Sequence, residues 1–314
     1  MKILVTGATG FIGSHVVPDL LAAGHQVRAL ARPTSDVSSL PAAVEVARGE
    51  LHAPGDACAG VDGLVHLAGI SGTMLRRGDP GDELRRVNVD GTHALFAAAR
   101  AAGVRRGVLV TSMWTVLRPE LAATSPYVRS RVESEQAALD ASGASMATVI
   151  LCPAFVVGAG DRGPNLPGAI VRDLSRGKMR VVPPGGSTWI AADDVARAVR
   201  AALERGEPGR RYPLGAEYLS YRDLGAAVAG MTGRRAPRWT APWGLVRLGG
   251  RGADLALALV GKHAPIPMAI GVELLCQREP LDCADAWAAL GTPRTRVLDA
   301  VQQAVTWFRA QEAS

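Results

Sequence analysis

The sequence predicts an α/β protein with a doubly wound parallel sheet, and three observations support that fold class. Short apolar segments alternate with amphipathic segments of helical length, a glycine-rich loop follows the first apolar segment, and the alternation returns near residue 191. Strands separated by helices pair in parallel through right-handed crossovers, so helices cover both faces of the sheet. The expected strands are Ile3–Thr6, Gln26–Leu30, Val44–Ala47, Gly63–Leu67, Val108–Ser112, Thr148–Leu151 and Arg211–Leu214.

The expected helices have the apolar spacing of segments that pack one face against a sheet. They are Phe11–Ala23, Leu84–Ala102, Tyr127–Ala141, Ala191–Leu203 and Val297–Ala310. Two of them are followed by Gly103 and Gly143, which suit the left-handed conformation that commonly ends a helix. The second half is less regular, and we expect Pro- and Gly-rich loops over residues 153–163 and 182–187.

The charge and cysteine content narrow the function classes. The chain has 314 residues and a formal net charge of +6, from 35 basic and 29 acidic residues. The arginines are scattered, with no basic block longer than two, and aromatic residues make up only 4%. These features argue against a nucleic-acid partner, which favours clustered cations and stacking platforms. The four cysteines form no Cys-x-x-Cys pair, and no His set has metal spacing, so we expect free thiols and no metal site.

No segment of the sequence has the length of a membrane span. The longest apolar stretch, Val149 to Val157, is interrupted by Pro153 and is far shorter than the roughly 20 residues that a bilayer requires. The N-terminal strand passes into the glycine loop without an apolar run of signal-peptide length. We therefore expect a soluble, cytoplasmic protein without a membrane partner.

The glycine-rich loop predicts a dinucleotide site. Gly7 permits a tight turn, Gly10 lets the backbone approach a pyrophosphate, and Gly13 lets the helix pack closely on the strand. The helix N-terminus adds free N–H groups and the positive end of its dipole. The run between strand and helix is Thr6-Gly7-Ala8-Thr9-Gly10-Phe11-Ile12-Gly13.

The end of the second strand favours NADPH over NADH. An NAD site places an acid there to bind the ribose 2′-hydroxyl, whereas a 2′-phosphate requires a cation. Here Arg32 occupies that position and no acid appears until Asp36. Arg32 with Thr34 or Ser35 is suited to chelating a phosphate, so we expect NADP(H), with NAD(H) less favoured.

With these features together, the chain resembles the extended short-chain dehydrogenase/reductase family, the NAD(P)-dependent epimerase/dehydratase group. The likeness runs over nearly the whole chain, and the run Val27-Arg28-Ala29-Leu30-Ala31-Arg32 is most similar to dihydroflavonol-reductase-type enzymes. Further segments that carry it are His66-Leu67-Ala68-Gly69, Asn88-Val89-Asp90-Gly91-Thr92, Tyr127-x-x-x-Arg131, Gly158–Arg162, Trp189–Ala196 and Tyr212–Gly215.

The resemblance implies a Rossmann domain and an interleaved substrate lobe. Residues 1–155 with 189–214 are expected to bind NADP, and residues 156–188 and 215–314 to form the smaller lobe. Glu50 and Leu51 would hold the adenine, where the family usually has Asp at the position of Glu50. The implied cofactor residues are Gly7, Thr9, Gly10, Phe11, Ile12, Gly13, Arg32, Glu50, Leu51, Leu67, Ala68, Gly69, Tyr127, Arg131, Pro153, Ala154, Phe155 and Val156.

Tyr127 and Arg131 are the expected catalytic pair. A carbonyl that accepts hydride develops negative charge on oxygen and needs a proton donor within hydrogen-bond reach. The two residues are four apart on a helix, so their side chains share one face, and the cation favours the phenolate. In the family that the chain resembles, a lysine stands at the position of Arg131 and also holds the nicotinamide ribose. Arginine keeps the charge but spreads it over a larger planar group.

A second departure from the family is Met113, where a Ser or Thr normally binds the substrate carbonyl. Thr111, Ser112 and Thr115 are the nearby hydroxyls, and the sequence leaves open which of them takes that role. The family's dehydratases carry Asp-Glu where this chain has Trp114-Thr115, so dehydration is not expected.

The leading hypothesis is an NADPH-dependent reductase of a small ketone or aldehyde, with the proton supplied by Tyr127. Trp189 and the sparsely charged segment Gly244–Met268 favour an apolar or aromatic substrate. The alternatives are a sugar-nucleotide epimerase and a non-catalytic dinucleotide-binding or regulatory protein. Family resemblance also implies a homodimer through the helices at 84–102 and 127–141.

Overall fold

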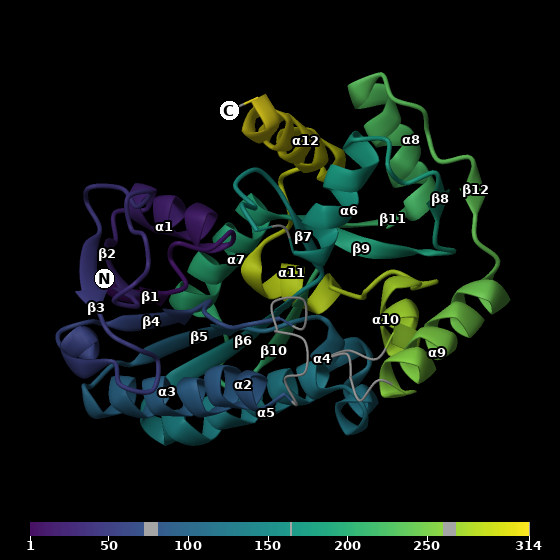
Figure 1. The fold of residues 1–314 in the computed structure, drawn as a ribbon. Coiled ribbons are helices and arrows are strands. Elements are labelled where there is room, and N and C mark those ends of the chain that lie inside the picture. Colours follow the sequence, from purple (N-terminus) through teal and green to yellow (C-terminus); the bar gives the residue numbers. More distant parts are fainter. Residues whose placement is uncertain (72–80, 164, 260–267, 314) are drawn as a thin grey trace.

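A seven-stranded, wholly parallel sheet forms the centre of the computed structural model, which describes residues 1–71, 81–163, 165–259 and 268–313 (Figure 1). The strand order is β3-β2-β1-β4-β5-β6-β10, so the chain changes direction across the sheet between β1 and β4. In open α/β sheets a ligand binds beyond the carboxyl ends of the strands at this point. The strands are β1 Lys2–Thr6, β2 Gln26–Ala31, β3 Glu45–Arg48, β4 Gly63–His66, β5 Arg106–Val110, β6 Ala147–Pro153 and β10 Arg211–Leu214.

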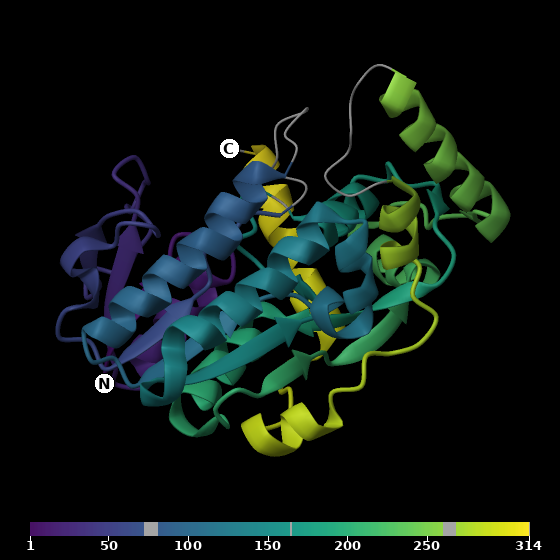
Figure 2. The ribbon, with the colours of Figure 1, turned by 90° about the horizontal axis from the view of Figure 1, so that it is seen from below.

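Helices cover both faces of this sheet, as a doubly wound fold requires (Figures 1 and 2). On one face α1 (Gly13–Ala22) and α7 (Ala192–Arg205) pack their apolar sides against alternate residues of the strands. On the other face α3 (Gly91–Ala101) and α5 (Pro126–Ser142) do the same. The predicted fold class is therefore confirmed.

The predicted helix at 84–102 is interrupted in the structure. It begins as a short α2 (Asp82–Leu84), continues as a π-helical segment over Arg85–Asp90 and then becomes α3. Single π turns within helices frequently accompany functional sites. Gly103 has a φ of +84° after α3, as expected, but Gly143 combines φ 55° with ψ −158° and is not a left-handed helical cap.

A second, three-stranded sheet lies over the carboxyl ends of the central strands. It has the order β11-β9-β7, from Glu217–Ser220, Gly186–Ala191 and Phe155–Val157. The expectation of loops at 153–163 and 182–187 is wrong in part, because β7 pairs in parallel with β9 and buries Phe155. The helices around this sheet are α6 Leu166–Ser175, α8 Tyr221–Thr232 and α12 Val297–Ala313, and a small pair of strands is β8 Val181–Val182 and β12 Trp239–Thr240.

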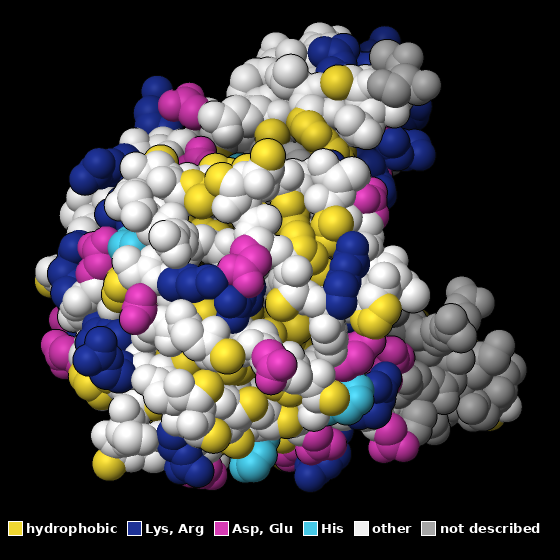
Figure 3. All heavy atoms as spheres, turned by 90° about the vertical axis from the view of Figure 1, so that its left-hand side faces the viewer, with side chains coloured by type: hydrophobic (Ala, Val, Ile, Leu, Met, Phe, Trp, Pro, Cys, Tyr) yellow, Lys and Arg dark blue, Asp and Glu magenta, His cyan; other side chains and the backbone are white. Residues whose placement is uncertain are grey.

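The remaining helices are short or peripheral. They are α4 Trp114–Leu117, α9 Trp243–Leu259, α10 Met268–Leu275 and α11 Ala284–Leu290, with 3-10 turns at Gly55–Cys58, Pro119–Ala123 and Gly143–Ser145. Among the described residues, no helix combines the length and apolarity needed to cross a bilayer. Basic and acidic side chains are interspersed on the face shown in Figure 3.

Candidate active site

The glycine loop has the closely packed geometry that its sequence predicts. Gly7 has a φ of +70°, and a Cβ there would lie 2.8 Å from the backbone nitrogen of Ala68. A Cβ on Gly13 would lie 2.2 Å from the carbonyl oxygen of Gly7. The N–H groups of Phe11 and Ile12, at the start of α1, meet no acceptor in the described part of the chain. The loop is therefore a tight turn that directs unpaired donors beyond the sheet.

The end of β4 is held to the glycine loop by a buried histidine. His66 hydrogen-bonds Thr6 Oγ1 through Nδ1 (2.6 Å) and Thr92 Oγ1 through Nε2 (3.0 Å). Burial, with a smaller effect of the Arg131 charge, lowers the pKa of His66 to about 3, so the ring is neutral. The Ala68 N–H also donates to Thr6 Oγ1 (3.3 Å). His66 therefore has a structural role and fixes the loop at 67–69.

Asn88, in the π-helical segment, connects three elements. Its Oδ1 accepts from the Ile70 N–H (2.9 Å), and its Nδ2 donates to the Ile70 carbonyl (3.0 Å) and to Ser130 Oγ (3.1 Å). The Ser130 hydroxyl in turn donates to the Tyr127 carbonyl (2.9 Å). Asn88 thus holds the chain after β4 against the helix that carries Tyr127.

Tyr127 and Arg131 share one face of α5, as the four-residue spacing predicts. The guanidinium carbon of Arg131 lies 5.6 Å from the centre of the Tyr127 ring. Arg131 Nη2 donates to the Ile70 carbonyl (3.4 Å), and a Cβ at Gly69 would lie 2.8 Å from Nη1. The Nε of Arg131 is buried and has no acceptor among the described residues. The Tyr127 hydroxyl likewise makes no hydrogen bond within the described chain.

The hydroxyl of Thr111 is engaged in a buried polar cluster. It donates to Glu135 Oε1 (2.7 Å), and the other oxygen of that carboxylate accepts from Arg211 Nε (2.6 Å). Thr115 also turns inward, donating to the Ser112 carbonyl (2.9 Å). Burial raises the pKa of the neighbouring Cys152 thiol to about 12. The cluster lies on the α5 side of the sheet and occupies two of the three candidate hydroxyls.

Ser112 differs from those two because its hydroxyl proton has no acceptor among the described residues. β5 ends at Val110, two residues before the predicted end, and the chain bends here into α4. Within the described residues, Ser112 Oγ accepts one long hydrogen bond, from the Trp114 N–H at 3.5 Å. The bend lets Ser112 leave the regular alternation of the strand.

Met113 is buried beside Gln277, from the far end of the sequence. Gln277 Nε2 lies 3.8 Å from Met113 Sδ and donates to Ser187 Oγ (3.0 Å). Its Oε1 is buried and accepts no hydrogen bond from the described residues. A pocket of about 280 Å³ opens next to this amide, lined by Trp114, Leu117, Arg118, Glu273, Cys276, Gln277, Arg278 and Glu279.

The carboxyl end of β6 completes this side. The Pro153 carbonyl accepts from the Met113 N–H (3.0 Å), which joins the two strand ends. Phe155 packs edge-on against Trp114 and Trp189, with ring centres 6.3 and 5.3 Å away. Trp189 is fully buried in β9, so it supports the site from behind and does not line it. The segment 244–268 includes residues 260–267, which lie outside the described residues.

Cations gather around the loop after β2. The side chain of Arg32 is exposed and has no partner in the described chain. Arg48 Nη1 donates to the backbone carbonyls of Arg32 and Ser35, both at 2.9 Å. A hydrogen bond from Ser38, with a smaller effect of the Arg162 charge, lowers the pKa of Asp36. Glu50 pairs with Ala53 in a short turn after β3, and Leu51 packs on Gly91.

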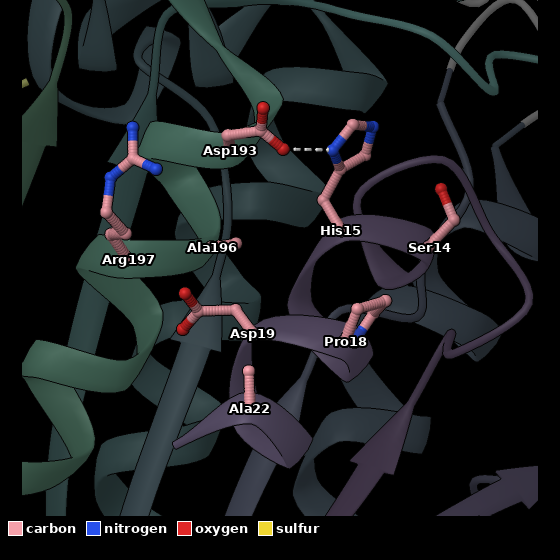
Figure 4. A pocket seen from close by; sticks show the side chains of 8 residues that line it. All are labelled: Ser14, His15, Pro18, Asp19, Ala22, Asp193, Ala196 and Arg197. Atoms are coloured by element: carbon pink, nitrogen blue, oxygen red, sulfur yellow. Dashed lines mark hydrogen bonds and ion pairs between the residues drawn. The ribbon is translucent and has the colours of Figure 1, made fainter. Parts of the chain in front are cut away.

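A histidine joins α1 to α7 beside the glycine loop. His15 binds Asp193 Oδ1 through Nδ1 (2.6 Å) and the Ala159 carbonyl through Nε2 (2.9 Å), and Figure 4 shows the ring directed at the carboxylate. Burial alone would lower the pKa of His15, but the bonds to Asp193 and Ala159 outweigh it and raise the pKa. The adjacent Asp194 accepts from the backbone N–H groups of Arg294 and Thr295, which gives it a structural role.

Sequence reasoning missed the roles of several residues in this region. Asn88 was part of a recognised segment, but no role followed from it. The role of Arg48 in holding the loop after β2 depends on the register of β2 and β3, which places Arg48 opposite Ala31. Gln277 and the partnership of His15 with Asp193 depend on contacts across more than 150 residues of sequence, and no local pattern indicated them.

Comparison with known proteins agrees with this geometry. Residues 3–215 match the model of the NAD dependent epimerase/dehydratase family. The chain is 33% identical to "Sterol demethylase protein B" of Methylococcus capsulatus, over 98% of each protein. It is 31% identical to a Synechocystis protein described, provisionally, as a dihydroflavonol 4-reductase, over 97% of this chain and 94% of that protein.

Solved structures give the same result for the fold. The crystal structure of gox2253 superposes with a TM-score of 0.86 at 28% identity, covering 99% of this chain and 98% of that one. The resemblance inferred from the glycine loop, the segment after β4 and Tyr127 is thereby confirmed. The chain belongs to the NAD dependent epimerase/dehydratase family, within the extended short-chain dehydrogenases/reductases.

Proposed function

We propose that this protein is an NADPH-dependent reductase of an apolar ketone or aldehyde. The observation that carries the proposal is the pair on α5, where the Tyr127 hydroxyl has no hydrogen-bond partner among the described residues and the guanidinium carbon of Arg131 lies 5.6 Å from the ring centre. The pair stands at the carboxyl ends of the parallel strands, beside the glycine loop and the loop at 67–69. This is the place at which an α/β sheet presents its reacting groups.

The residues present fit a dinucleotide. The glycine cradle would be filled by any Cβ at Gly13, and the Phe11 and Ile12 N–H groups, which meet no acceptor in the part of the chain that the structure describes, suit a pyrophosphate. The Nε of Arg131, which is buried and has no acceptor among the described residues, suits a ribose hydroxyl. The exposed Arg32, on a loop fixed by Arg48, suits a 2′-phosphate and favours NADPH.

The chain's residues then perform the proton transfer. When bound, the nicotinamide supplies the hydride that reduces the carbonyl carbon. Tyr127 donates its proton to the carbonyl oxygen, where negative charge develops, and Arg131 stabilises the phenolate that remains. Ser112, the nearby hydroxyl without an acceptor for its proton, takes the carbonyl-binding role that Met113 cannot fill.

The pocket beside Trp114 suits a substrate with an apolar body and a polar group. Trp114, Leu117 and Cys276 provide apolar surface, and Arg118, Glu273, Arg278 and Glu279 line the rest with charge. The Oε1 of Gln277, which accepts no hydrogen bond from the described residues, can accept one from a substrate hydroxyl. A relative similar over its whole length carries a sterol-related name, which agrees with a substrate of this kind. We propose that residues 156–188 and 215–314 serve as the substrate lobe.

The test is NADPH consumption by the purified protein with a steroid ketone, an aromatic ketone and an aliphatic aldehyde. We expect turnover of at least one, with a lower KM for NADPH than for NADH and a raised KM for the substrate in Gln277→Leu. Conversion of UDP-glucose to UDP-galactose without net cofactor consumption would instead establish the epimerase. Tight NADPH binding with no turnover of any of these compounds would indicate a non-catalytic binding protein.

A further inference from the structure

An exposed row of leucines on α9 takes no part in the proton transfer proposed above. Leu245, Leu248, Leu255 and Leu259 are 65%, 67%, 64% and 78% exposed. Their spacings of three, seven and four residues bring all four to one side of the helix. Soluble proteins rarely leave such a continuous apolar face open without a binding role.

The opposite side of α9 packs on α10. Gly250 approaches that helix so closely that a Cβ would lie 3.0 Å from Ala269 Cα. Asp254 accepts hydrogen bonds from the backbone N–H groups of Met268 (2.6 Å) and Ala269 (2.9 Å). These contacts fix the helix so that its leucine face points outward, and α9 projects from the body in Figure 2.

The residues on and just before α9 carry a strong excess of positive charge. Five exposed arginines lie between residues 233 and 259, and the one acid in that stretch is Asp254, which is engaged with α10. The arginines are Arg234, Arg235, Arg238, Arg247 and Arg251. The exposed Trp239, at 72%, adds an aromatic side chain of the kind that favours a membrane interface. Leucines with flanking arginines are the signature of a helix that lies in the plane of an anionic bilayer.

A second copy of the chain is the less suitable occupant. A two-fold contact through α9 would bring the same surface of both subunits together. It would place ten arginines near one another, and the only acids in the same stretch would be the two Asp254 carboxylates, which already accept hydrogen bonds from α10. An anionic lipid surface instead supplies complementary charge and lipid chains for the leucines. No described helix is long enough to span a bilayer, so the contact is peripheral.

We propose that α9 binds the surface of an anionic lipid bilayer through Leu245, Leu248, Leu255 and Leu259, with the flanking arginines on the phosphates. Our expectation of no membrane partner rested on the absence of a span, which does not concern a helix lying on the surface. Arg278, which lines the pocket beside Trp114, stacks on Trp243 at the start of α9, with its guanidinium carbon 5.7 Å from the ring centre. Docking would therefore place the pocket near the lipid.

Co-sedimentation with vesicles tests the proposal independently of activity. The wild-type chain is expected to bind phosphatidylcholine vesicles containing phosphatidylglycerol and to bind pure phosphatidylcholine much less. Leu248→Gln with Leu255→Gln should lower the partition coefficient by roughly tenfold or more, because two side chains lose their transfer to lipid. Arg247→Gln with Arg251→Gln should lower it by about tenfold and weaken its salt dependence. Leu166→Gln, at an exposed leucine on α6, is the matched control and should bind like wild type.

Two results would overturn the proposal. One is a lack of leucine-dependent binding. In that case the wild-type protein stays in the supernatant with the mixed vesicles, or the double leucine variant binds them as strongly as wild type. The other is a concentration-dependent dimer, seen by sedimentation velocity, that the leucine variant abolishes while vesicle binding is absent. Because these leucines are exposed, the variants should keep the wild-type unfolding temperature, and circular dichroism confirms that folded proteins are being compared.

Discussion

The guanidinium of Arg131 is supported by backbone groups that a sequence pattern does not reveal. It lies against Gly69 and the Ile70 carbonyl, and Asn88 holds the same stretch of chain from the other side. A side chain at position 69 would collide with Nη1, so the glycine and the arginine fit each other. The helical spacing predicted that Tyr127 and Arg131 share a face, but the contact with residue 69 is set by the tertiary fold.

Substitutions at position 131 separate a catalytic from a structural role. Arg131→Lys keeps the positive charge near Tyr127, so we expect kcat within about tenfold of wild type. Arg131→Met removes the charge that stabilises the phenolate and should lower kcat by roughly 10²–10³-fold. Steady-state NADPH oxidation measures both, and equilibrium binding of NADPH controls for cofactor affinity. Equal kcat values for wild type and Arg131→Met would show that the pair is only structural.

Among the elements, the central sheet could be predicted from sequence because each strand carries its own apolar run between turn signals. All seven predicted strands are present, within two residues at each end. The strands of the second sheet were missed, since β7 and β9 lie among prolines and glycines and form through pairing with distant residues. Residues 189–191, assigned in advance to the cofactor domain, lie in β9 of that second sheet.

The pairing of β2 with β3 gives a prediction about cofactor choice. Arg48, at the end of β3, holds the carbonyls of Arg32 and Ser35 in the loop that we assign to the 2′-phosphate. Arg48→Met should loosen that loop and raise the Kd for NADPH about tenfold, the range of a charged hydrogen bond. The Kd for NADH, which lacks the phosphate, should change little. Isothermal titration calorimetry gives both values, and a parallel loss of both would contradict the assignment.

The contact between α1 and α7 gives a pH prediction. Because His15 has a raised pKa in the folded state, its stabilisation is fully present below the unfolded pKa near 6.5 and is lost as pH rises through the folded pKa. The unfolding temperature of wild type should therefore fall from about pH 6.5 upward more steeply than that of His15→Gln. Differential scanning fluorimetry across this range measures the slopes. Parallel curves would mean that the link to Asp193 does not contribute.

At the scale of the whole molecule, the fold brings together residues far apart in sequence on one side of the sheet. The glycine loop, the loop at 67–69, Tyr127 and Gln277 come from four separate parts of the chain. The sequence identified the first three through their motifs, and it contained no sign of the fourth. A homodimer through the helices at 84–102 and 127–141 and a cytoplasmic location stay predictions.

Isotope transfer is the most direct test of the central claim that Tyr127 and Arg131 support hydride reduction of a carbonyl. NADPH carrying two deuterium atoms at nicotinamide C4 is incubated with the protein and a ketone that it turns over, and the alcohol is analysed by mass spectrometry. We expect one deuterium on the carbinol carbon, and a rate at saturating NADPH about 10²–10⁴-fold lower in Tyr127→Phe. An alcohol without deuterium, or full activity in Tyr127→Phe, would contradict the account.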